Sequence, residues 1–282
     1  MKFHNPGSEV YVPDGGPADQ ALARTTHMGI GAHQDDLEIM AYHGILECFG
    51  KADRHFTGVT VTNGAGSPRD DLYAKYTDED MQKIRRVEQR KAAYVGEYAA
   101  QVFLDYTSGE VKDKNNPDVI GDLKQLLSAA KPRVIYTHNL ADKHDTHVGV
   151  ALRVIHAVRS LPVAERPEKL YGCEVWRGLD WLNDEDKVFF DVTAHENLAM
   201  SLVGVFDSQI CGGKRYDLAT AGRRRANATY FASHATDVAQ SVIFGIDLTP
   251  LIHDAKLDLG KYIQGFIDRF AQDVSGRLSR LS

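Results

Sequence analysis

Histidine and aspartate side chains are concentrated in two short polar segments of this 282-residue chain. The first contains His33, Asp35 and Asp36, and the second contains His144 and His147. Imidazole nitrogen and carboxylate oxygen suit Zn2+, and a catalytic zinc takes three protein ligands and leaves a position open for water. These residues predict a site that activates water with His33, one aspartate, and His147 or His144 as ligands. The other aspartate is then available as a base.

Each polar segment follows an apolar, strand-like stretch and precedes a helical pattern. The expected strands are 25–32, 56–62, 102–106 and 134–137, and the helices that follow them are 36–49, 79–99, 119–130 and 146–161. Four such repeats predict an α/β fold with a mostly parallel, Rossmann-like sheet and helices on both faces. Ligands bind beyond the carboxyl ends of the strands in such sheets, so the two polar segments are expected at the same edge.

The remainder of the chain is predicted to belong to the same domain, 1–282. Residues 1–24 are rich in proline and glycine and are expected to form an irregular arm, and 25–210 form the core. Residues 211–282 form a C-terminal elaboration that ends in an amphipathic helix, because apolar residues recur there at spacings of three and four from Leu259 to Leu281. Further strands are expected at 171–176, 188–192 and 241–246, and further helices at 194–206 and 217–232.

The amino-acid composition limits the classes of partner that the protein is expected to bind. With 33 basic and 39 acidic residues the net charge is −6, which disfavours nucleic acid and anionic membranes as partners. The three cysteines lie far apart without a CxxC pair, so thiolate zinc sites and a disulfide framework are excluded and a cytoplasmic location is expected. No export signal or membrane span is visible. A small-molecule substrate fits best, and a homo-oligomer is compatible with the sequence.

The two polar segments resemble a known family. Residues 32–38, AHQDDLE, resemble the Ala-His-Pro-Asp-Asp-x-Glu signature of the PIG-L (LmbE-like) de-N-acetylases, and residues 144–147, HDTH, resemble the family's His-Pro-Asp-His signature. Weaker matches are the Arg-x-x-Glu helix at Arg85 and Glu88, the strand ending at Asp105, Asp191, and the Ser-Gln pair at 208–209. The resemblance covers about residues 25–210.

The resemblance implies a function and roles for these residues. His33, Asp36 and His147 would bind Zn2+, although another divalent metal such as Fe2+ would suit the same ligands. Asp35 would be the general base that activates water, and His144 would stabilise the oxyanion. Members of the family remove acetyl groups from N-acetylglucosamine-type sugars. Arg85 and Asp105 are weaker candidates for substrate contacts.

Two positions depart from the family pattern. Gln34 replaces a proline, which removes rigidity from the turn but no reacting group. Thr146 stands where the family has an aspartate, and a threonine cannot stabilise a positive charge on His144 as a carboxylate does. Asp145, one position earlier, is a candidate to compensate.

Simpler interpretations of the same residues exist. Asp36 could be a helix cap, Arg85 and Glu88 a surface ion pair, and His144 and His147 a solvated helix start. The other histidines, His138 among them, are interpreted as structural or surface residues.

Four other functions compete with deacetylation. A dinucleotide-binding turn fails because position 34 is not glycine and carboxylates there would repel a pyrophosphate, and a serine hydrolase fails because no GxSxG elbow occurs. A metal-containing sugar-binding protein with weakened catalysis, or a zinc hydrolase of another amide, remains an alternative. Retention of Asp35 argues against a pure binder, which needs no base.

Overall fold

A computed structural model describes residues 1–282. Its strands form one sheet in the order β1-β4-β3-β2-β5-β6-β8-β7. Their bounds are β1 (Glu9–Tyr11), β2 (His27–Gly31), β3 (Phe56–Thr62), β4 (Ala100–Tyr106), β5 (Val134–His138), β6 (Lys169–Cys173), β7 (Val188–Asp191) and β8 (Val242–Asp247). The strands from β4 to β6 pair in parallel, whereas β1, β7 and β8 pair antiparallel. The predicted mostly parallel sheet is therefore confirmed.

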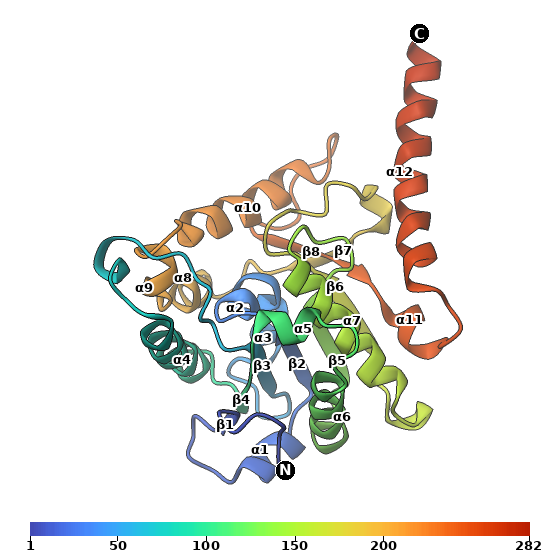
Figure 1. Ribbon diagram of the computed structural model, residues 1–282. Coiled ribbons are helices and arrows are strands. Elements are labelled where there is room, and N and C mark those ends of the chain that lie inside the picture. The colour runs from blue at the N-terminus through green and yellow to red at the C-terminus, as the bar shows by residue number, and fades with distance from the viewer.

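Helices cover both faces of the sheet (Figure 1). Their bounds are α1 (Ala18–Ala23), α2 (Asp36–Met40), α3 (Tyr42–Cys48), α4 (Asp78–Val95), α5 (Ser108–Lys112), α6 (Asp118–Ala130), α7 (Asp145–Arg159), α8 (Glu196–Gly204), α9 (Asp207–Ile210), α10 (Tyr216–Tyr230), α11 (Thr249–His253) and α12 (Leu259–Leu281). Side chains of α1, α6, α7 and α11 form the core on one face, and those of α2, α3, α4 and α8 form the core on the other. None of these helices is both long enough and apolar enough to cross a lipid bilayer.

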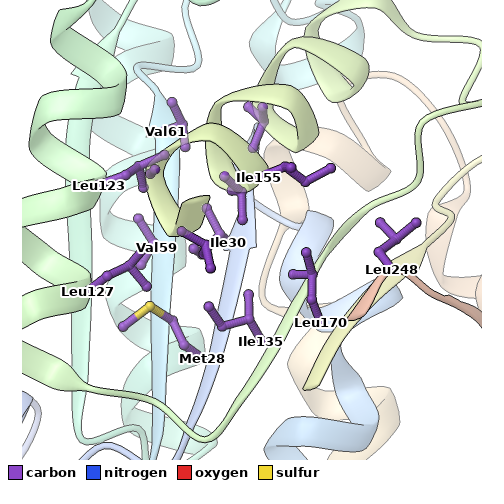
Figure 2. Packing of buried hydrophobic residues seen from close by; sticks show 14 of the residues in the cluster. Met28, Ile30, Val59, Val61, Leu123, Leu127, Ile135, Ile155, Leu170 and Leu248 are labelled. Atoms are coloured by element: carbon purple, nitrogen blue, oxygen red, sulfur yellow. The ribbon is translucent and has the colours of Figure 1, made fainter. Parts of the chain in front are cut away.

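The larger core lies between the sheet and the pair of helices α6 and α7. Figure 2 shows Met28 and Ile30 of β2 beside Val59 of β3, with Leu123 of α6 and Ile155 of α7 packed against them. These side chains are fully buried. Alternate residues of each strand point into this layer, as the twofold period of a strand requires. The packed layer fixes β2 and β5 side by side, and the two polar segments follow these strands.

Close packing explains the glycines that resemble a dinucleotide-binding turn. A Cβ atom on Gly29 would come within 2.7 Å of the Phe56 ring, and one on Gly31 would come within 3.1 Å of Leu37 and Asp36. Helix α2 therefore lies directly against β2, and only glycine leaves room for it. The glycines position the start of α2 rather than a cofactor.

Helix α4 begins at a capping box. Thr77 Oγ1 accepts a hydrogen bond from the backbone N–H of Asp80, and the Asp80 carboxylate accepts one from the N–H of Thr77, which together form a capping box. The end of the helix was predicted too late. Glu97 adopts a left-handed conformation with φ of 54°, which stops the helix and turns the chain into β4.

Two other local predictions were wrong. The N-terminal arm is not wholly irregular, because its residues 9–11 form β1 along the edge of β4 and residues 18–23 form α1. The helix expected over 36–49 is broken at Ala41 into α2 and α3. The break lets Gly44 lie against the Tyr136 ring, where a Cβ atom would come within 2.5 Å. Packing against the sheet thus overrides a continuous helical pattern.

Helix α12 confirms the amphipathic pattern but is only partly packed. Its first turns bury Ile263 and Phe266, and the rest extends away from the body of the molecule to the C-terminus (Figure 1). It lies away from the carboxyl ends of β2 and β5, so it does not contribute to the site that follows those strands.

Candidate functional site

The first polar segment is a sharp turn between β2 and α2. Asp35 adopts a left-handed conformation with φ of 93°, which is costly for a residue other than glycine. The turn brings Asp36 back toward His33, whose backbone N–H donates to Asp36 Oδ2 at 2.7 Å. His33 Nδ1 lies 3.3 Å from the same oxygen. The two neighbouring aspartates consequently point to different places, with Asp36 beside His33 and Asp35 on the cavity wall.

Gln34 holds this turn in place. Its side-chain amide donates to the carbonyl of Thr62 at 3.2 Å, and its own carbonyl accepts a hydrogen bond from Arg85 at 2.9 Å. The rigidity that a proline would supply at this position is thus replaced by hydrogen bonds to β3 and α4. Gly64 permits the arrangement, because a Cβ atom there would lie 2.5 Å from the Gln34 side chain.

The second polar segment joins β5 to α7. His147 lies in the first turn of α7 and is fully buried. Its Nδ1 lies 3.1 Å from Asp142 Oδ2, so this nitrogen carries a proton and leaves the Nε2 lone pair free. Asp142 also accepts a hydrogen bond from the backbone N–H of His144 at 2.9 Å. A carboxylate behind a histidine is the usual way to orient a metal ligand.

The three side chains predicted as metal ligands converge on one point. His147 Nε2 lies 3.2 Å from His33 Nδ1 and 3.6 Å from Asp36 Oδ2, and the latter two atoms are 3.3 Å apart. Tetrahedral zinc with bonds of about 2.0–2.2 Å places its ligand atoms roughly 3.3–3.6 Å apart. The donor set and its spacing therefore fit a zinc-sized cation.

The charges around this triangle favour a cation. Although burial acts against it, the carboxylates of Asp36 and Asp142 raise the pKa of His147. Asp36 is also buried, yet His147 and His138 hold its pKa well below the usual range. The pocket thus stabilises positive charge beside an ionised carboxylate, and a divalent cation satisfies that preference better than one proton.

His138 is a site residue whose place the sequence did not reveal. It ends β5 and is fully buried, with Nε2 3.3 Å from Asp36 Oδ2 and its ring stacked on His147 at 3.9 Å. Asp36, His138 and His147 therefore form a second grouping of metal-binding atoms. However, the N–H of Ala32 donates to His138 Nε2 at 2.9 Å, and burial and His147 lower its pKa to about 4. The N–H of Ala32 thus occupies the lone pair of His138 Nε2. We therefore interpret His138 as a structural residue that packs behind the candidate ligands.

Asp35 lies beside the triangle but outside it. Its side chain is buried and lines a cavity. Its backbone N–H donates to Gln89 at 3.4 Å, but its carboxylate accepts no hydrogen bond within the protein. Burial and the negative charge of Asp36 raise its pKa well above the usual value. A carboxylate that is free of partners and has a raised pKa is suited to accepting a proton.

His144 also faces the cavity. Its ring stacks on His147 at 4.6 Å, and burial and the neighbouring His147 lower its pKa, so the imidazole is neutral. A neutral imidazole still donates one N–H hydrogen bond. Thr146 is buried at the cavity wall, whereas Asp145 is exposed and makes no hydrogen bond with His144. The structure therefore gives no compensating carboxylate to His144 at position 145.

Arg85 and Glu88 are buried and do not form the surface ion pair that was considered. Arg85 donates to the carbonyl of Gly64 at 3.1 Å and to Ser67 Oγ at 3.0 Å, besides its bond to the first turn. Glu88 accepts hydrogen bonds from Ser208 N at 2.7 Å and from its hydroxyl at 2.6 Å. The Arg-x-x-Glu and Ser-Gln motifs thus connect α4, α9 and the cavity wall.

The remaining candidates differ in their relation to the cavity. Arg85 lines the cavity, so its position allows the predicted contact with a substrate. Asp105 does not line it and instead pairs with Arg86 at 2.8 Å near the N-terminal arm. The end of β4, which was predicted to carry Asp105 to the site, lies away from the cavity because β3 stands between β4 and β2.

The cavity lies at the carboxyl ends of β2, β3 and β5 and has a volume of about 650 Å3. Its lining is mostly polar, and its one large aromatic platform is Trp176, with Tyr216 beside it. Trp176 is thus placed to stack on a sugar. Trp181 does not line the cavity, and Tyr136 is packed in the core.

The comparisons with known proteins agree with the resemblance. The PIG-L family model, described as GlcNAc-PI de-N-acetylase, matches residues 28–158. This range contains both polar segments, and the family resemblance seen in the motifs is thereby confirmed. The curated proteins gave no match.

Solved structures show the same fold at low sequence identity. N,N'-diacetylchitobiose deacetylase from Pyrococcus horikoshii is 16% identical with a TM-score of 0.60, over 82% of this chain and 86% of that chain. A conserved protein from Thermus thermophilus is 18% identical with a TM-score of 0.60, over 79% and 94%. The 4-carboxy-2-hydroxymuconate hydratase from Pseudomonas putida is 16% identical with a TM-score of 0.60, over 79% and 96%. The α/β fold is thus shared by proteins with different reactions.

Proposed function

We propose that this chain, whose residues 28–158 match the PIG-L family, is a metal-dependent hydrolase that removes the acetyl group from an N-acetylglucosamine-type sugar or glycoconjugate. The observation that carries the proposal is the triangle of His33, Asp36 and His147 with the unpartnered carboxylate of Asp35 beside it. Three ligands with a free base at a polar cavity are the parts that amide hydrolysis by activated water requires.

In this proposal His33, Asp36 and His147 hold Zn2+, or another divalent metal such as Fe2+. When bound, the metal supplies a Lewis acid that acidifies water and polarises a carbonyl. Asp35 accepts the proton of the attacking water, whose oxygen bonds to the acetyl carbon. As the carbon–nitrogen bond breaks, Asp35 returns that proton to the amine, because an amide anion is a poor leaving group. Acetate and a free amino sugar are the products.

His144 stabilises the charge that develops on the carbonyl oxygen. Its neutral ring donates one N–H hydrogen bond, and its stacking on His147 holds it beside the ligands. The absence of a carboxylate partner makes this donor weaker than an imidazolium. We therefore expect His144 to assist the reaction less than Asp35 does.

The shared fold leaves other reactions to be separated by experiment, because one structural neighbour is a hydratase. Acetate release from a panel of N-acetyl sugars by metal-loaded protein tests the proposal, with Asp35→Asn as the comparison. We expect Asp35→Asn to retain the metal and to lose at least about a hundredfold in kcat, as removal of a general base does. If wild type releases acetate no faster than Asp35→Asn from every substrate, the deacetylase assignment fails. Normal metal content in His33→Ala would refute the ligand assignment.

We also propose that the whole chain acts as a single deacetylase domain in the cytoplasm. The one sheet includes β1 from the N-terminal segment and β8 from the C-terminal elaboration, which supports a single unit. The three cysteines are free thiols, which agrees with a reducing compartment.

A further inference from the structure

Three lysines stand around the cavity without acidic partners. Lys112 ends α5, Lys143 precedes α7, and Lys214 lies between α9 and α10; together we call them the lysine rim. All three are exposed, and none takes part in an ion pair. Separate segments of the chain therefore bring positive charge to one opening.

The charge at this opening is opposite to that of the chain as a whole. The cavity lining contains the lysine rim and Arg85 as cations, and Asp35 and Asp36 as its only carboxylates. The whole chain has a net charge of −6. A metal held by Asp36 would make the opening more positive still. A concave site of one sign attracts ligands of the opposite sign more strongly than a flat surface does.

Trp176 connects part of the lysine rim to the reacting groups. The Nζ atoms of Lys143 and Lys214 lie 5.1 and 5.0 Å from the centre of its ring. The same ring lies nearly parallel to His144 and His147, with centres 6.4 Å apart in both cases. The two ammonium groups are thus kept on the side of the cavity next to the candidate metal ligands. A cation–π contact at an exposed site is weak, so it holds the ammonium groups there without preventing them from turning to an anion.

We propose that the lysine rim binds an anionic group, a phosphate or a carboxylate, on the part of the substrate that leaves with the amino sugar. This inference rests on the proposed deacetylase function and names the substrate class within it. Lysine is suited to this role because its ammonium is a point charge that binds phosphate or carboxylate without a fixed geometry. The sugar would lie over Trp176 with its acetamide directed to Asp35 and the ligand triangle.

Matched substrates test this selectivity. The anionic substrates are N-acetylglucosamine 1-phosphate and the carboxymethyl glycoside of N-acetylglucosamine, and the neutral counterpart is the hydroxyethyl glycoside. We expect kcat/KM to be at least about tenfold higher for one or both anionic substrates, with an advantage that shrinks as salt is added. Comparison of the phosphate with the carboxylate identifies which anion is preferred. Equal kcat/KM for all three substrates would overturn the inference while leaving deacetylation intact.

Variants with equal changes of charge locate the effect. Replacing the whole lysine rim by glutamine should reduce the anionic preference, which is the ratio of kcat/KM for an anionic substrate to kcat/KM for the neutral substrate in the same protein, to about twofold or less. The control protein carries Lys91→Gln, Lys124→Gln and Lys256→Gln, three exposed lysines that do not line the cavity. It should keep the full preference. A similar loss in both triple variants would show that only net charge matters and would refute a binding role for the rim.

A binding measurement separates this inference from the function on which it rests. Glucosamine 1-phosphate and methyl glucosaminide are titrated calorimetrically into metal-loaded wild type and the rim variant. Tighter binding of the phosphate by wild type alone supports the anion site, even if no substrate releases acetate and the deacetylase proposal fails. Equal binding of the two sugars, or equal phosphate binding by the two proteins, overturns the anion site whatever the activity.

Discussion

Replacing Asp142 by asparagine should weaken the candidate metal site without disturbing the fold. The side chain is buried, and its two oxygens accept hydrogen bonds from His147 Nδ1 at 3.1 Å and from the backbone N–H of His144 at 2.9 Å. Although burial acts against it, the hydrogen bond from His147 lowers the pKa of Asp142. The residue therefore meets two donors as an ionised carboxylate.

Asparagine can satisfy only one of these donors with its single oxygen. If the oxygen stays with the backbone N–H of His144, the amide NH2 faces His147 Nδ1. That nitrogen must then accept a hydrogen bond, which moves the imidazole proton to Nε2, the atom that points at His33 and Asp36. Removal of such an orienting partner typically lowers metal affinity by about 10–100-fold, or about 1.4–2.7 kcal/mol.

Competition with a chromophoric zinc chelator measures the affinity directly. Asp145→Asn is the matched control, because Asp145 is an aspartate three residues away that is exposed and makes no hydrogen bond with the candidate ligands. Urea unfolding of the metal-free proteins checks that both variants fold. Zinc affinity of Asp142→Asn within twofold of wild type, or an equal loss in Asp145→Asn, would show that Asp142 does not orient His147.

Two further predictions concern stability of the metal-free protein. Burial raises the pKa of Glu38 to about 7, although hydrogen bonds from Tyr98 and Gln89 act to lower it. Its pKa in the unfolded chain is about 4.3, so the folded state holds the proton more tightly, and stability falls by up to about 3 kcal/mol as pH rises from about 4.3 to 7. Urea unfolding at several pH values should show a smaller fall for Glu38→Gln, and an unchanged slope would contradict the assignment. Ser208→Ala removes a 2.6 Å hydrogen bond to the buried Glu88 carboxylate and should cost about 2 kcal/mol in urea unfolding, whereas a change below about 0.5 kcal/mol would show that the bond contributes little.

The repeating pattern of strands and helices made the central fold predictable. Each strand from β2 to β5 is a short apolar run, and in the helix that follows it apolar residues recur at helical spacing. The alternation of strands and helices can therefore be recognised from local sequence. The start of α4 is local in the same way, because its capping box involves only Thr77 and Asp80. The break at Ala41 and the pairing of β1 with β4 were not predictable, because both depend on contacts with distant parts of the chain.

The candidate ligands were predictable because they lie in motifs at strand ends. His33, Asp36 and His147 are within a few residues of β2 or β5, so parallel pairing alone brings them together. His138 and Asp142 lie in the same connection as His147, but their roles depend on how the chain turns between β5 and α7. No pattern in residues 139–144 encodes that turn, so the orientation of these side chains emerged only from the structure.

The place of β2 beside β5 has a consequence for how the site forms. From β2 the chain adds β3 and β4 on one side before β5 returns to the other side, so the two polar segments adjoin only when that return is complete. His33 and His147 are 114 positions apart, and closing such a long segment is among the more demanding steps in assembling a sheet. Neither the turn after β2 nor the start of α7 contains all three candidate ligands. Tight uptake of a metal would therefore report that β2 and β5 have paired, which would make the ion a probe of the folding order of this chain.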